Sequence, residues 1–484
     1  MAKKYITTTL PYVNADPHLG HATEFVRADA LARFYKSVGD EVFLNTGTDE
    51  HGQKIYDKAR EVGEDPQAYV DRYAEVFKRI LAPEALNIMP EVHFIRTTDA
   101  HHKHAAQEMW RRCMANVDES GRPDIYKAVQ SVKYCVGCEL EKTDSELEQG
   151  KCPIHPRYDI EIREEENYFF RFSRYQAQLL TLYDTHPHFV VPDFRLAEIR
   201  AFVAGGLQDF SVSRLKSKMA WGVPVPDDEE HIMYVWFDAL TNYISTTGWP
   251  EQEDCGGWWP GIQLAGKDNL RQQSAIWQAM LLSAGMQPSL QIFVGGFIIS
   301  DGQKMSKSLG NVISPLELVA RYGTDATRYL LLRHVHPFDD TDITWERLDE
   351  WYTAHLVNGL GNLVARVMKM AEDNLSAPVL VASQPFETAF SDALTRFRFD
   401  EAMNMIFAHI GKGDEYIQET QPFKMLKSGD VRVMAEGKEI ITRLVTHVYR
   451  IAEHLVPVMP DTARIIQNAV RTNKKPDNLF ARLD

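Results

Sequence analysis

Long apolar runs are absent from this sequence. No stretch of about 18 consecutive apolar residues occurs among its 484 positions, so a membrane-spanning helix is not expected. Residues 1–4 lead directly into an apparent strand and lack the apolar core of a signal peptide, so export is not expected either. The composition, 44% hydrophobic and 25% charged, is that of an ordinary globular protein, and the length suits about two to four domains.

Cysteine and positive charge are scarce as well. Three of the five cysteines lie close together, at positions 135, 138 and 152, whereas Cys113 and Cys255 lie apart. Such a cluster fits a metal site in a reducing compartment better than a disulfide framework, and it predicts a cytoplasmic location. The formal net charge of −15 argues weakly against a nucleic-acid partner, since polyanions repel but a local basic groove can coexist with an acidic remainder.

A strand–turn–helix unit opens the chain. Residues 5–10 form a β-branched run that reads as a buried strand. Asp16 is a good N-cap and Pro17 a good first residue for the helix that follows, and its first turn carries His18 and His21. Paired helical histidines are usually ordinary surface or core residues. At a helix N-terminus after a strand, however, they predict an anion site suited to phosphate.

Strands and helices then alternate. Further strands are expected over residues 42–45, 94–98, 263–266 and 291–297, with helical patterns between them. This rhythm predicts a parallel sheet with ligands at the carboxyl ends of its strands. From Val117 to about Asp209 the chain changes to short strands, turns and charge, which indicates an insertion. From Trp345 onward the pattern is almost entirely helical.

The cysteine cluster forms two knuckles. Cys135-x-x-Cys138 is followed, thirteen residues on, by Cys152-x-x-His155. Two unrelated turns are the alternative, but three thiols and an imidazole at this spacing are the ligand set of a tetrahedral zinc site. Four protein ligands leave no open position, so one structural Zn²⁺ is predicted.

A second basic motif lies late in the chain. Lys304-Met305-Ser306-Lys307-Ser308 is on its own most often a solvated turn, but glycines on both sides would let it close over a ligand. Together with Pro17-His18-Leu19-Gly20-His21, in this order, it resembles the paired motifs of class I aminoacyl-tRNA synthetases. Further stretches resemble the methionyl-tRNA synthetase family: residues 9–12, 48–52, 234–239 and 266–268.

The resemblance covers nearly the whole chain and implies an α/β fold. A Rossmann-type parallel-sheet catalytic domain is expected, split by a zinc-binding connective insertion and followed by an all-α anticodon-binding domain. The implied divisions are the first catalytic half at 1–116, the insertion at 117–225, the second catalytic half at 226–300, the lysine loop and stem-contact region at 301–345, and the helical domain at 346–484.

The resemblance also implies a two-step reaction. Methionine and ATP form methionyl-adenylate, and the methionyl group then passes to tRNA(Met). The catalytic residues would be His18, His21, Lys304 and Lys307, and the ATP-binding residues would add Gly266 and Asp268, with Mg²⁺ bound to ATP. Arg214 is a further candidate near the reacting groups.

An apolar pocket for the thioether is implied too. Its candidate residues are Leu10, Tyr12, Asp49, Trp236, Ala239 and Tyr243, with the Asp49 carboxylate as the partner of the methionine ammonium group. The chain departs from the family pattern beside this pocket. Residues 269–273 read Asn-Leu-Arg-Gln-Gln where the family commonly ends in Phe-His, and Leu240 replaces a frequent proline.

The helical domain carries a polar stripe. Asn358, Asn362 and Arg366 recur every four residues, which on pattern alone is usually the wet face of a helix. The resemblance makes it an anticodon-reading helix, because amides and a guanidinium can read the edges of unstacked bases. Phe423 stands after a proline where the family usually has a tryptophan, and it can still stack on a base.

Two other functions compete with this interpretation. A class I synthetase for leucine, isoleucine, valine or cysteine is the nearest alternative, but the first three carry a much larger insertion and the last places zinc in its active site. A non-catalytic tRNA-binding relative is the second, although all four phosphate-handling residues are present. The chain ends after a helical pattern with no appended β-barrel, so a monomer without membrane association is expected.

Overall fold

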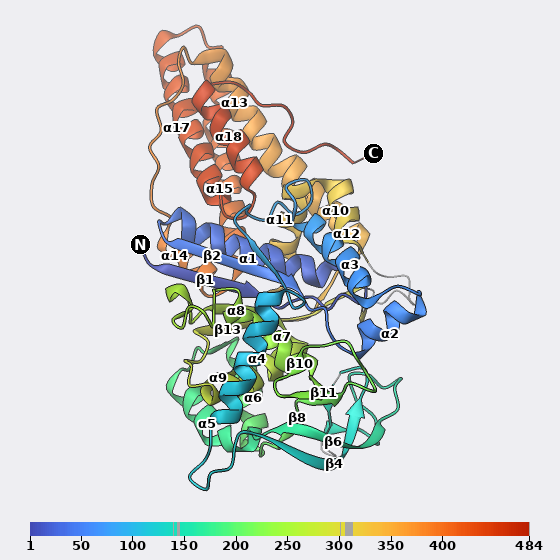
Figure 1. Cartoon of the computed structure of the whole chain (residues 1–484). Helices are drawn as coiled ribbons and strands as arrows, with labels where there is room; N and C mark the ends of the chain where they lie inside the picture. Colours follow the sequence, from blue (N-terminus) through green and yellow to red (C-terminus); the bar gives the residue numbers. More distant parts are fainter. Residues whose placement is uncertain (139, 143–145, 301, 305–312, 484) are drawn as a thin grey trace.

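A six-stranded parallel sheet is the centre of the molecule (Figure 1). The computed structural model describes residues 1–138, 140–142, 146–300, 302–304 and 313–483. The strand order is β3-β2-β1-β12-β13-β7, with bounds β1 Lys3–Thr8, β2 Glu41–Thr48, β3 His93–Arg96, β7 Val190–Val191, β12 Ile262–Gly266 and β13 Gln291–Gly295. The predicted Rossmann-type α/β class is confirmed.

The strand order reverses beside β1. From β1 the chain proceeds outward to β2 and β3 on one side, whereas β12 and β13 extend the sheet on the other side. Ligands of such sheets bind at the carboxyl ends of the strands where the order reverses. Ile6 and Thr7 of β1 are fully buried, as expected for a central strand covered on both faces.

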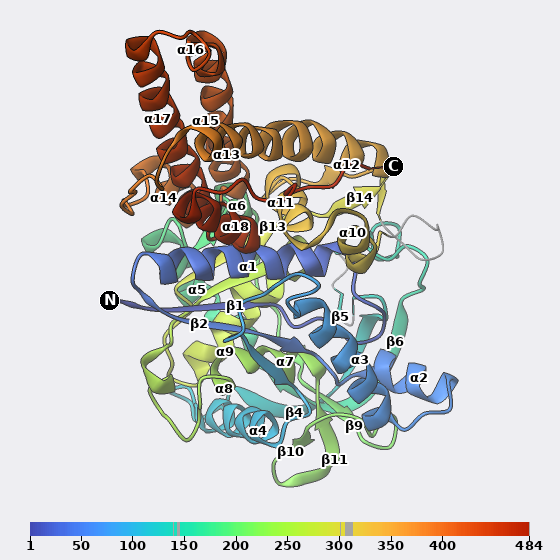
Figure 2. The ribbon, with the colours of Figure 1, turned by 90° about the horizontal axis from the view of Figure 1, so that it is seen from above.

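Three helices connect the first three strands, and a fourth follows β3. They are α1 Leu19–Ser37, α2 Gln53–Glu61, α3 Pro66–Leu81 and α4 Ala100–Ala115. Helix α1 lies between the sheet and the C-terminal helices, as the view from above shows (Figure 2). A second hydrophobic core on the other side of the sheet joins α4 to the segment after it.

The segment 117–225 builds a sheet of its own. Its four antiparallel strands have the order β5-β4-β6-β8. Strand β7 of the same segment nevertheless pairs with β13 and forms one edge of the main sheet. The further bounds are β4 Ile125–Cys135, β5 Leu140–Glu141, β6 Glu161–Phe170, η2 Phe172–Tyr175, α5 Gln176–Thr185, α6 Asp193–Ala204, β8 Phe210–Ser211, β9 Ser213–Leu215 and β10 Pro224–Val225.

Residues 226–345 supply strands β12 and β13 of the main sheet. Two small three-stranded sheets, β10-β11-β9 and β15-β14-β16, flank the main one. The elements are β11 Asp228–Met233, α7 Val235–Leu240, α8 Asn242–Ser245, η3 Cys255–Gly257, η4 Lys267–Asn269, the π-helix η5 Gln272–Ile276, α9 Trp277–Ser283, β14 Ile298–Ser300, β15 Gln303–Lys304, α10 Pro315–Tyr322, α11 Thr324–His334 and β16 Thr341–Asp342.

The remaining described chain is helical, as predicted. Its elements are α12 Trp345–Trp351, the π-helix η7 Tyr352–Gly361, α13 Asn362–Asn374, α14 Thr388–Thr395, α15 Phe399–Thr420, α16 Pro422–Met425, α17 Val431–Leu455 and α18 Pro460–Thr472. Across the part of the chain that is described, we find no helix with the length and apolar character that a bilayer crossing requires.

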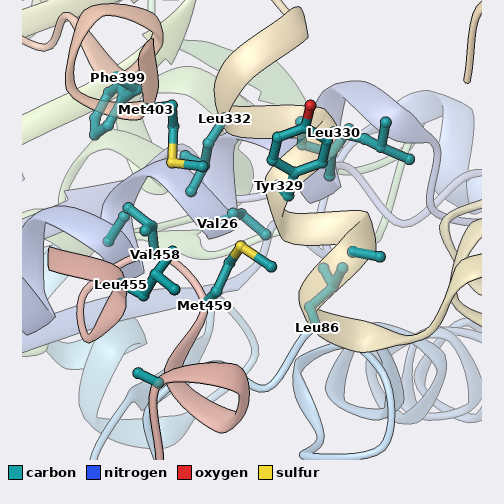
Figure 3. Packing of buried hydrophobic residues seen from close by; sticks show 14 of the residues in the cluster. Val26, Leu86, Tyr329, Leu330, Leu332, Phe399, Met403, Leu455, Val458 and Met459 are labelled. Carbon is teal, nitrogen blue, oxygen red and sulfur yellow. The ribbon is translucent and has the colours of Figure 1, made fainter. Parts of the chain in front are cut away.

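One continuous core joins the helical region to the sheet domain. Val26 of α1, Leu330 of α11, Met403 of α15 and Leu455 of α17 converge in it (Figure 3). All four side chains are at most 2% exposed, so the helices cannot move away from α1 without exposing this apolar surface. The helical region is therefore packed firmly against α1.

A buried arginine fastens the same junction. Arg328 of α11 is fully buried, and its guanidinium lies 2.6 Å from the carboxylate of Asp29 on α1. It also donates to the carbonyl oxygens of Val458 at 2.9 Å and Leu86 at 3.0 Å. One side chain thus links α11 to three separate segments.

Replacing this arginine should destabilise the whole chain. In Arg328→Met the buried Asp29 loses a charged partner and the carbonyls lose their donor, so the free energy of unfolding should fall by about 3–5 kcal/mol. Urea denaturation followed by circular dichroism measures it. Arg464→Met is the control, because the ion pair of Arg464 with Asp461 is exposed and should be worth at most about 1 kcal/mol. Equal losses in both variants would contradict this role.

Candidate active site

The turn after β1 pairs with the end of β2. Asp49 donates its backbone N–H to the Pro11 carbonyl at 2.9 Å, and Val13 donates to the Asp49 carbonyl at 3.2 Å. This pairing sets Tyr12 directly beside Asp49 at the carboxyl end of the sheet. Two of the predicted methionine-binding residues are therefore neighbours, although 36 positions separate them in the sequence.

The two histidines of the first motif form the cap of α1. Nδ1 of His18 accepts the Gly20 N–H at 3.1 Å, and Nδ1 of His21 accepts the His18 N–H at 3.4 Å. The rings stack with their centroids 3.8 Å apart. Because backbone donors occupy both Nδ1 atoms, each neutral ring carries its proton on Nε2. Burial, and then the neighbouring His18, lower the pKa of His21 well below its usual value, so His21 is a neutral donor.

The expected cap of this helix was wrong. Helix α1 begins at Leu19, and its N-cap is His18 instead of Asp16. The reason lies in Gly20, where a Cβ would stand only 2.9 Å from Cε1 of His18. Without that Cβ the His18 ring can fold back over the first turn and take the place of an aspartate cap.

A carboxyl group that sequence reasoning missed lies one turn further along α1. One oxygen of Glu24 accepts both the backbone N–H and the hydroxyl of Thr9, each at 2.6 Å. Burial raises the pKa of Glu24 to about 8; the Thr9 hydrogen bonds oppose that rise, and the carboxyl of Asp268 adds to it. Glu24 is thus hydrogen-bonded to Thr9, just after β1. It is also close enough to Asp268, just after β12, for the two carboxyls to repel each other.

The two residues after Asp49 hold the loop after β2 in place. The fully buried Glu50 accepts two hydrogen bonds from the Arg96 guanidinium, at 2.7 and 2.9 Å. His51 contacts the buried carboxylate of Asp238 through Nδ1 at 2.5 Å, and His102 contacts its other oxygen at 2.8 Å. Burial acts to raise the pKa of Asp238, but the two imidazoles outweigh it and lower the pKa to about 2.

Three candidate residues of the methionine pocket lie on the short helices after β11. Trp236 and Ala239 belong to α7, which Asp238 ties to the Asp49 loop, and Tyr243 belongs to α8. Ala239 and Tyr243 are buried, and Trp236 is half-buried with an indole N–H that has no partner among the described residues. Arg214 lies with its guanidinium 4.7 Å from the ring centre of Tyr234, the residue before α7.

The sequence that departs from the family pattern forms a π-helical turn. Gln272–Ile276 is η5, and the buried Gln273 side chain donates to the Tyr243 hydroxyl at 2.6 Å. Arg271 contacts Glu146 of the insertion at 2.5 Å. This polar packing around Tyr243 was not predicted.

The lysine motif is described only at its start. The backbone of Lys304 pairs with Ile299 in the hairpin of β14 and β15. Lys307 falls within 305–312, outside the described residues. Gly266 ends β12, the strand adjacent to β1, and Asp268 comes two residues later, so both lie at the carboxyl end of that strand.

The predicted zinc ligands converge. One donor atom from each of Cys135, Cys138, Cys152 and His155 lies within 4.8 Å of every other. The Cys138 sulfur is 3.3 Å from that of Cys152 and 3.2 Å from Nδ1 of His155. A Cβ at Gly137 would stand 2.2 Å from the His155 ring, so the first knuckle leaves room for the imidazole only because that residue is glycine. Three sulfurs and one nitrogen at this spacing fit a structural Zn²⁺.

The polar stripe of the helical domain lies on a helix with a π segment. Asn358 lies in the π-helix η7 and Asn362 begins α13, so the stripe crosses from one helical form into the other. Both asparagines are exposed. Arg366 is ion-paired with Asp414 of α15 at 2.9 Å. Phe423 is 41% exposed on α16, at the outer tip of α15 and α17 (Figure 2).

Comparisons with known proteins agree with this geometry. The family described as tRNA synthetases class I (M) matches residues 4–159 and 144–368. The methionine–tRNA ligase of Thermotoga maritima is 38% identical over 98% of this chain and 76% of that protein. That of Thermosynechococcus vestitus is 39% identical over 95% of this chain and 88% of that protein. The Mycobacterium tuberculosis methionyl-tRNA synthetase in complex with methionyl-adenylate has a TM-score of 0.88 at 36% identity, covering 96% of this chain and 93% of that one.

This chain belongs to the methionyl-tRNA synthetase family. It is a methionine–tRNA ligase that acts through methionyl-adenylate, and the recognition based on the paired motifs is confirmed. Two contacts near the site were not predicted from the sequence: that of the Glu24 carboxyl with Thr9 and that of the Gln273 amide with Tyr243. The spacing of residues gives no signal for such contacts, because each joins residues that are far apart in the sequence.

The metal cluster should contain zinc in the purified protein. We expect about one zinc ion per chain by elemental analysis, since four ligands form one closed site. Cys152→Ala should lose most of it, whereas Cys113→Ala should keep it, because Cys113 is a buried thiol outside the cluster. Absence of metal from the unaltered protein, or full zinc in Cys152→Ala, would contradict the assignment.

Proposed function

We propose that one site, where the strand order reverses between β1 and β12, binds methionine and ATP together. The observation that carries this proposal is the continuity of the chain there. Leu10 and Tyr12 lie in the turn after β1, and six residues after Tyr12 His18 caps α1. A ligand that spans from the turn to the helix cap would touch both groups at once.

Methionine binds on the side of the β1 turn. Asp49 accepts the ammonium group, since a carboxylate fixed by strand pairing is a good partner for a cation. Leu10, Tyr12, Trp236, Ala239 and Tyr243 surround the thioether with apolar and polarisable groups. The support is the pairing of Tyr12 with Asp49 and the tie from Asp238 of α7 to His51.

ATP binds on the side of the helix cap. The Nε2–H groups of His18 and His21 donate to its phosphates at the positive end of α1. Gly266 and Asp268 hold the adenosine part, with the Asp268 carboxylate on the ribose. Lys304 and Lys307 close over the pyrophosphate that leaves, and Mg²⁺ bound with ATP supplies further positive charge.

The chemistry needs no nucleophile from the protein. The methionine carboxylate attacks the α-phosphorus of ATP and pyrophosphate leaves, which gives methionyl-adenylate. A hydroxyl of the terminal tRNA ribose then attacks the carbonyl carbon of the adenylate, forming the ester as AMP leaves. Catalysis consists of alignment and of stabilising the charge that develops on the phosphates. Arg214 is a further candidate to contact the reacting groups.

The anticodon of tRNA(Met) is read at the far end. Asn358 and Asn362 present exposed amides to unstacked bases, Arg366 presents a guanidinium oriented by Asp414, and Phe423 offers a partly exposed ring for stacking.

A cytoplasmic location agrees with a cluster of thiols suited to zinc. The monomeric state and the domain boundaries stay predictions.

Loss of the second motif lysine should slow the first step. Lys307→Ala should reduce methionine-dependent ATP–pyrophosphate exchange by about 10²–10³-fold, because one donor to the developing charge is removed. The melting temperature should not change. Lys427→Ala is the control, since Lys427 is an exposed lysine in the helical domain. Exchange at the unaltered rate in Lys307→Ala would overturn the assignment.

Loss of an anticodon contact should affect only the tRNA-dependent step. Asn362→Ala should lower kcat/KM for aminoacylation of tRNA(Met) by the equivalent of about 1–3 kcal/mol and leave pyrophosphate exchange unchanged. Asn468→Ala, at another exposed helical asparagine, serves as the control. Unchanged aminoacylation in Asn362→Ala would remove this residue from the interface.

A further inference from the structure

Two histidines and a glutamate gather on the surface where α4 meets the loop after α8. His101 and His104 lie at the start of α4, and Glu251 belongs to the loop of residues 246–254. Nδ1 of His101 is 3.4 Å from one oxygen of the Glu251 carboxylate, and Nε2 of His104 is 3.6 Å from the other oxygen. None of the three residues belongs to the proposed substrate site, so the function described above leaves them unused.

The start of α4 is fixed so that both histidines face outward. His102, between them, is fully buried, and its two ring nitrogens contact the Asp238 carboxylate at 2.8 Å and the Ser245 hydroxyl at 2.9 Å. Positions three apart lie on the same face of a helix. Because His102 is directed inward, His101 and His104 share an exposed face of α4.

The loop that carries Glu251 is held against the same helix, which packs beside α8 (Figure 2). Arg112 of α4 donates two hydrogen bonds to the Glu253 carboxylate, both at 2.6 Å. Its guanidinium also lies 5.0 Å from the ring centre of Trp249, which is fully buried. These two contacts, one on each side of Glu251 in the sequence, hold the backbone of the loop beside α4.

A backbone carbonyl sets the position of the proton on His101. Nε2 of His101 lies 2.8 Å from the carbonyl oxygen of Ser245. A carbonyl can only accept, so Nε2 carries a proton, and the neutral ring has its lone pair on Nδ1, the atom that faces Glu251. Histidines that bind metals are commonly oriented in this way, with one ring nitrogen donating to a carbonyl or carboxylate and the other nitrogen on the metal.

The distances around Glu251 suit a shared cation. Two ligands that lie about 2.0–2.1 Å from one Zn²⁺ at a tetrahedral angle are about 3.4 Å apart. The separations of 3.4 and 3.6 Å therefore leave room for an ion between each imidazole nitrogen and the carboxylate. The side chains of His101, His104 and Glu251 are 42%, 52% and 59% exposed, so they can turn toward one ion, and an ion from solution can reach them.

We propose that His101, His104 and Glu251 form a second zinc site, on the surface and separate from the Cys3His cluster. Two imidazoles and a carboxylate are a ligand set that Zn²⁺ takes with its fourth position left to water. Imidazole nitrogens disfavour Ca²⁺ and Mg²⁺, which prefer oxygen ligands. The bound ion joins α4 to the loop after α8, so it stabilises the folded chain over the unfolded one.

Zinc titration of the unaltered chain tests the site. Because the site is exposed and has three protein ligands, its ion exchanges readily, and desalting after a zinc load leaves only the ion of the closed Cys3His cluster. Isothermal titration calorimetry with Zn²⁺ at neutral pH should then show one further equivalent per chain. The melting temperature should rise as Zn²⁺ is added.

Three variants locate the further ion. Glu251→Gln and His104→Ala should each lose the further equivalent and the rise in melting temperature. Their melting temperatures without added Zn²⁺ should equal that of the unaltered chain, because both side chains are exposed. His188→Ala, at an exposed histidine away from the three ligands, is the control and should keep both effects.

Diffraction provides a second measurement that needs no variant. Crystals of the unaltered chain soaked in Zn²⁺, with data collected above the zinc absorption edge, should show an anomalous peak between Nδ1 of His101, Nε2 of His104 and the Glu251 carboxylate. A peak at other side chains alone would overturn the proposal.

The titration can overturn the proposal in two ways. If the unaltered chain takes up no further Zn²⁺, the two histidines are only ion-paired with Glu251. If Glu251→Gln and His104→Ala keep the further equivalent, or if His188→Ala loses it as well, the ion binds elsewhere. Neither result affects the proposed function, because the three residues lie outside the substrate site.

Discussion

The backbone pairing between the turn after β1 and the end of β2 is the constraint on which the active site depends. Through it, Tyr12 and Asp49 become neighbours at the carboxyl edge of the sheet. The loop that carries Asp49 is then held by Glu50 on the side of Arg96 and by His51 on the side of Asp238. In the proposed site the backbone of Asp49 is thus held by the contacts of its two following residues, so binding of the amino acid would need little reorganisation of this loop.

The acidity of the chain does not oppose its polyanionic substrates at this site. The groups that we propose to bind phosphate on α1 are the helix N-terminus and two imidazoles whose Nδ1 atoms accept backbone hydrogen bonds. Such donors attract phosphate without contributing to the net charge of −15. The argument from net charge against a nucleic-acid partner also omits oriented backbone dipoles.

Local patterns predicted the features that local patterns determine. The strand–helix unit at the start, the alternation of strands and helices, the Cys3His cluster and the helical C-terminal region all depend on spacing within a few tens of residues. The cap of α1 by His18 was missed because it needs the absence of a side chain at Gly20. The Arg328 junction and the hydrogen bond from Gln273 to Tyr243 join segments that lie far apart in the sequence. No spacing rule reports such contacts.

The central claim is that one strand–turn–helix brings methionine and ATP together. A crystal structure of this chain with a non-hydrolysable methionyl-adenylate analogue tests it most directly. The account predicts the ammonium group at Asp49, the thioether beside Tyr12 and Tyr243, and the phosphate mimic at His18 and His21. An analogue bound with its amino-acid end away from Tyr12 and Asp49 would contradict the account.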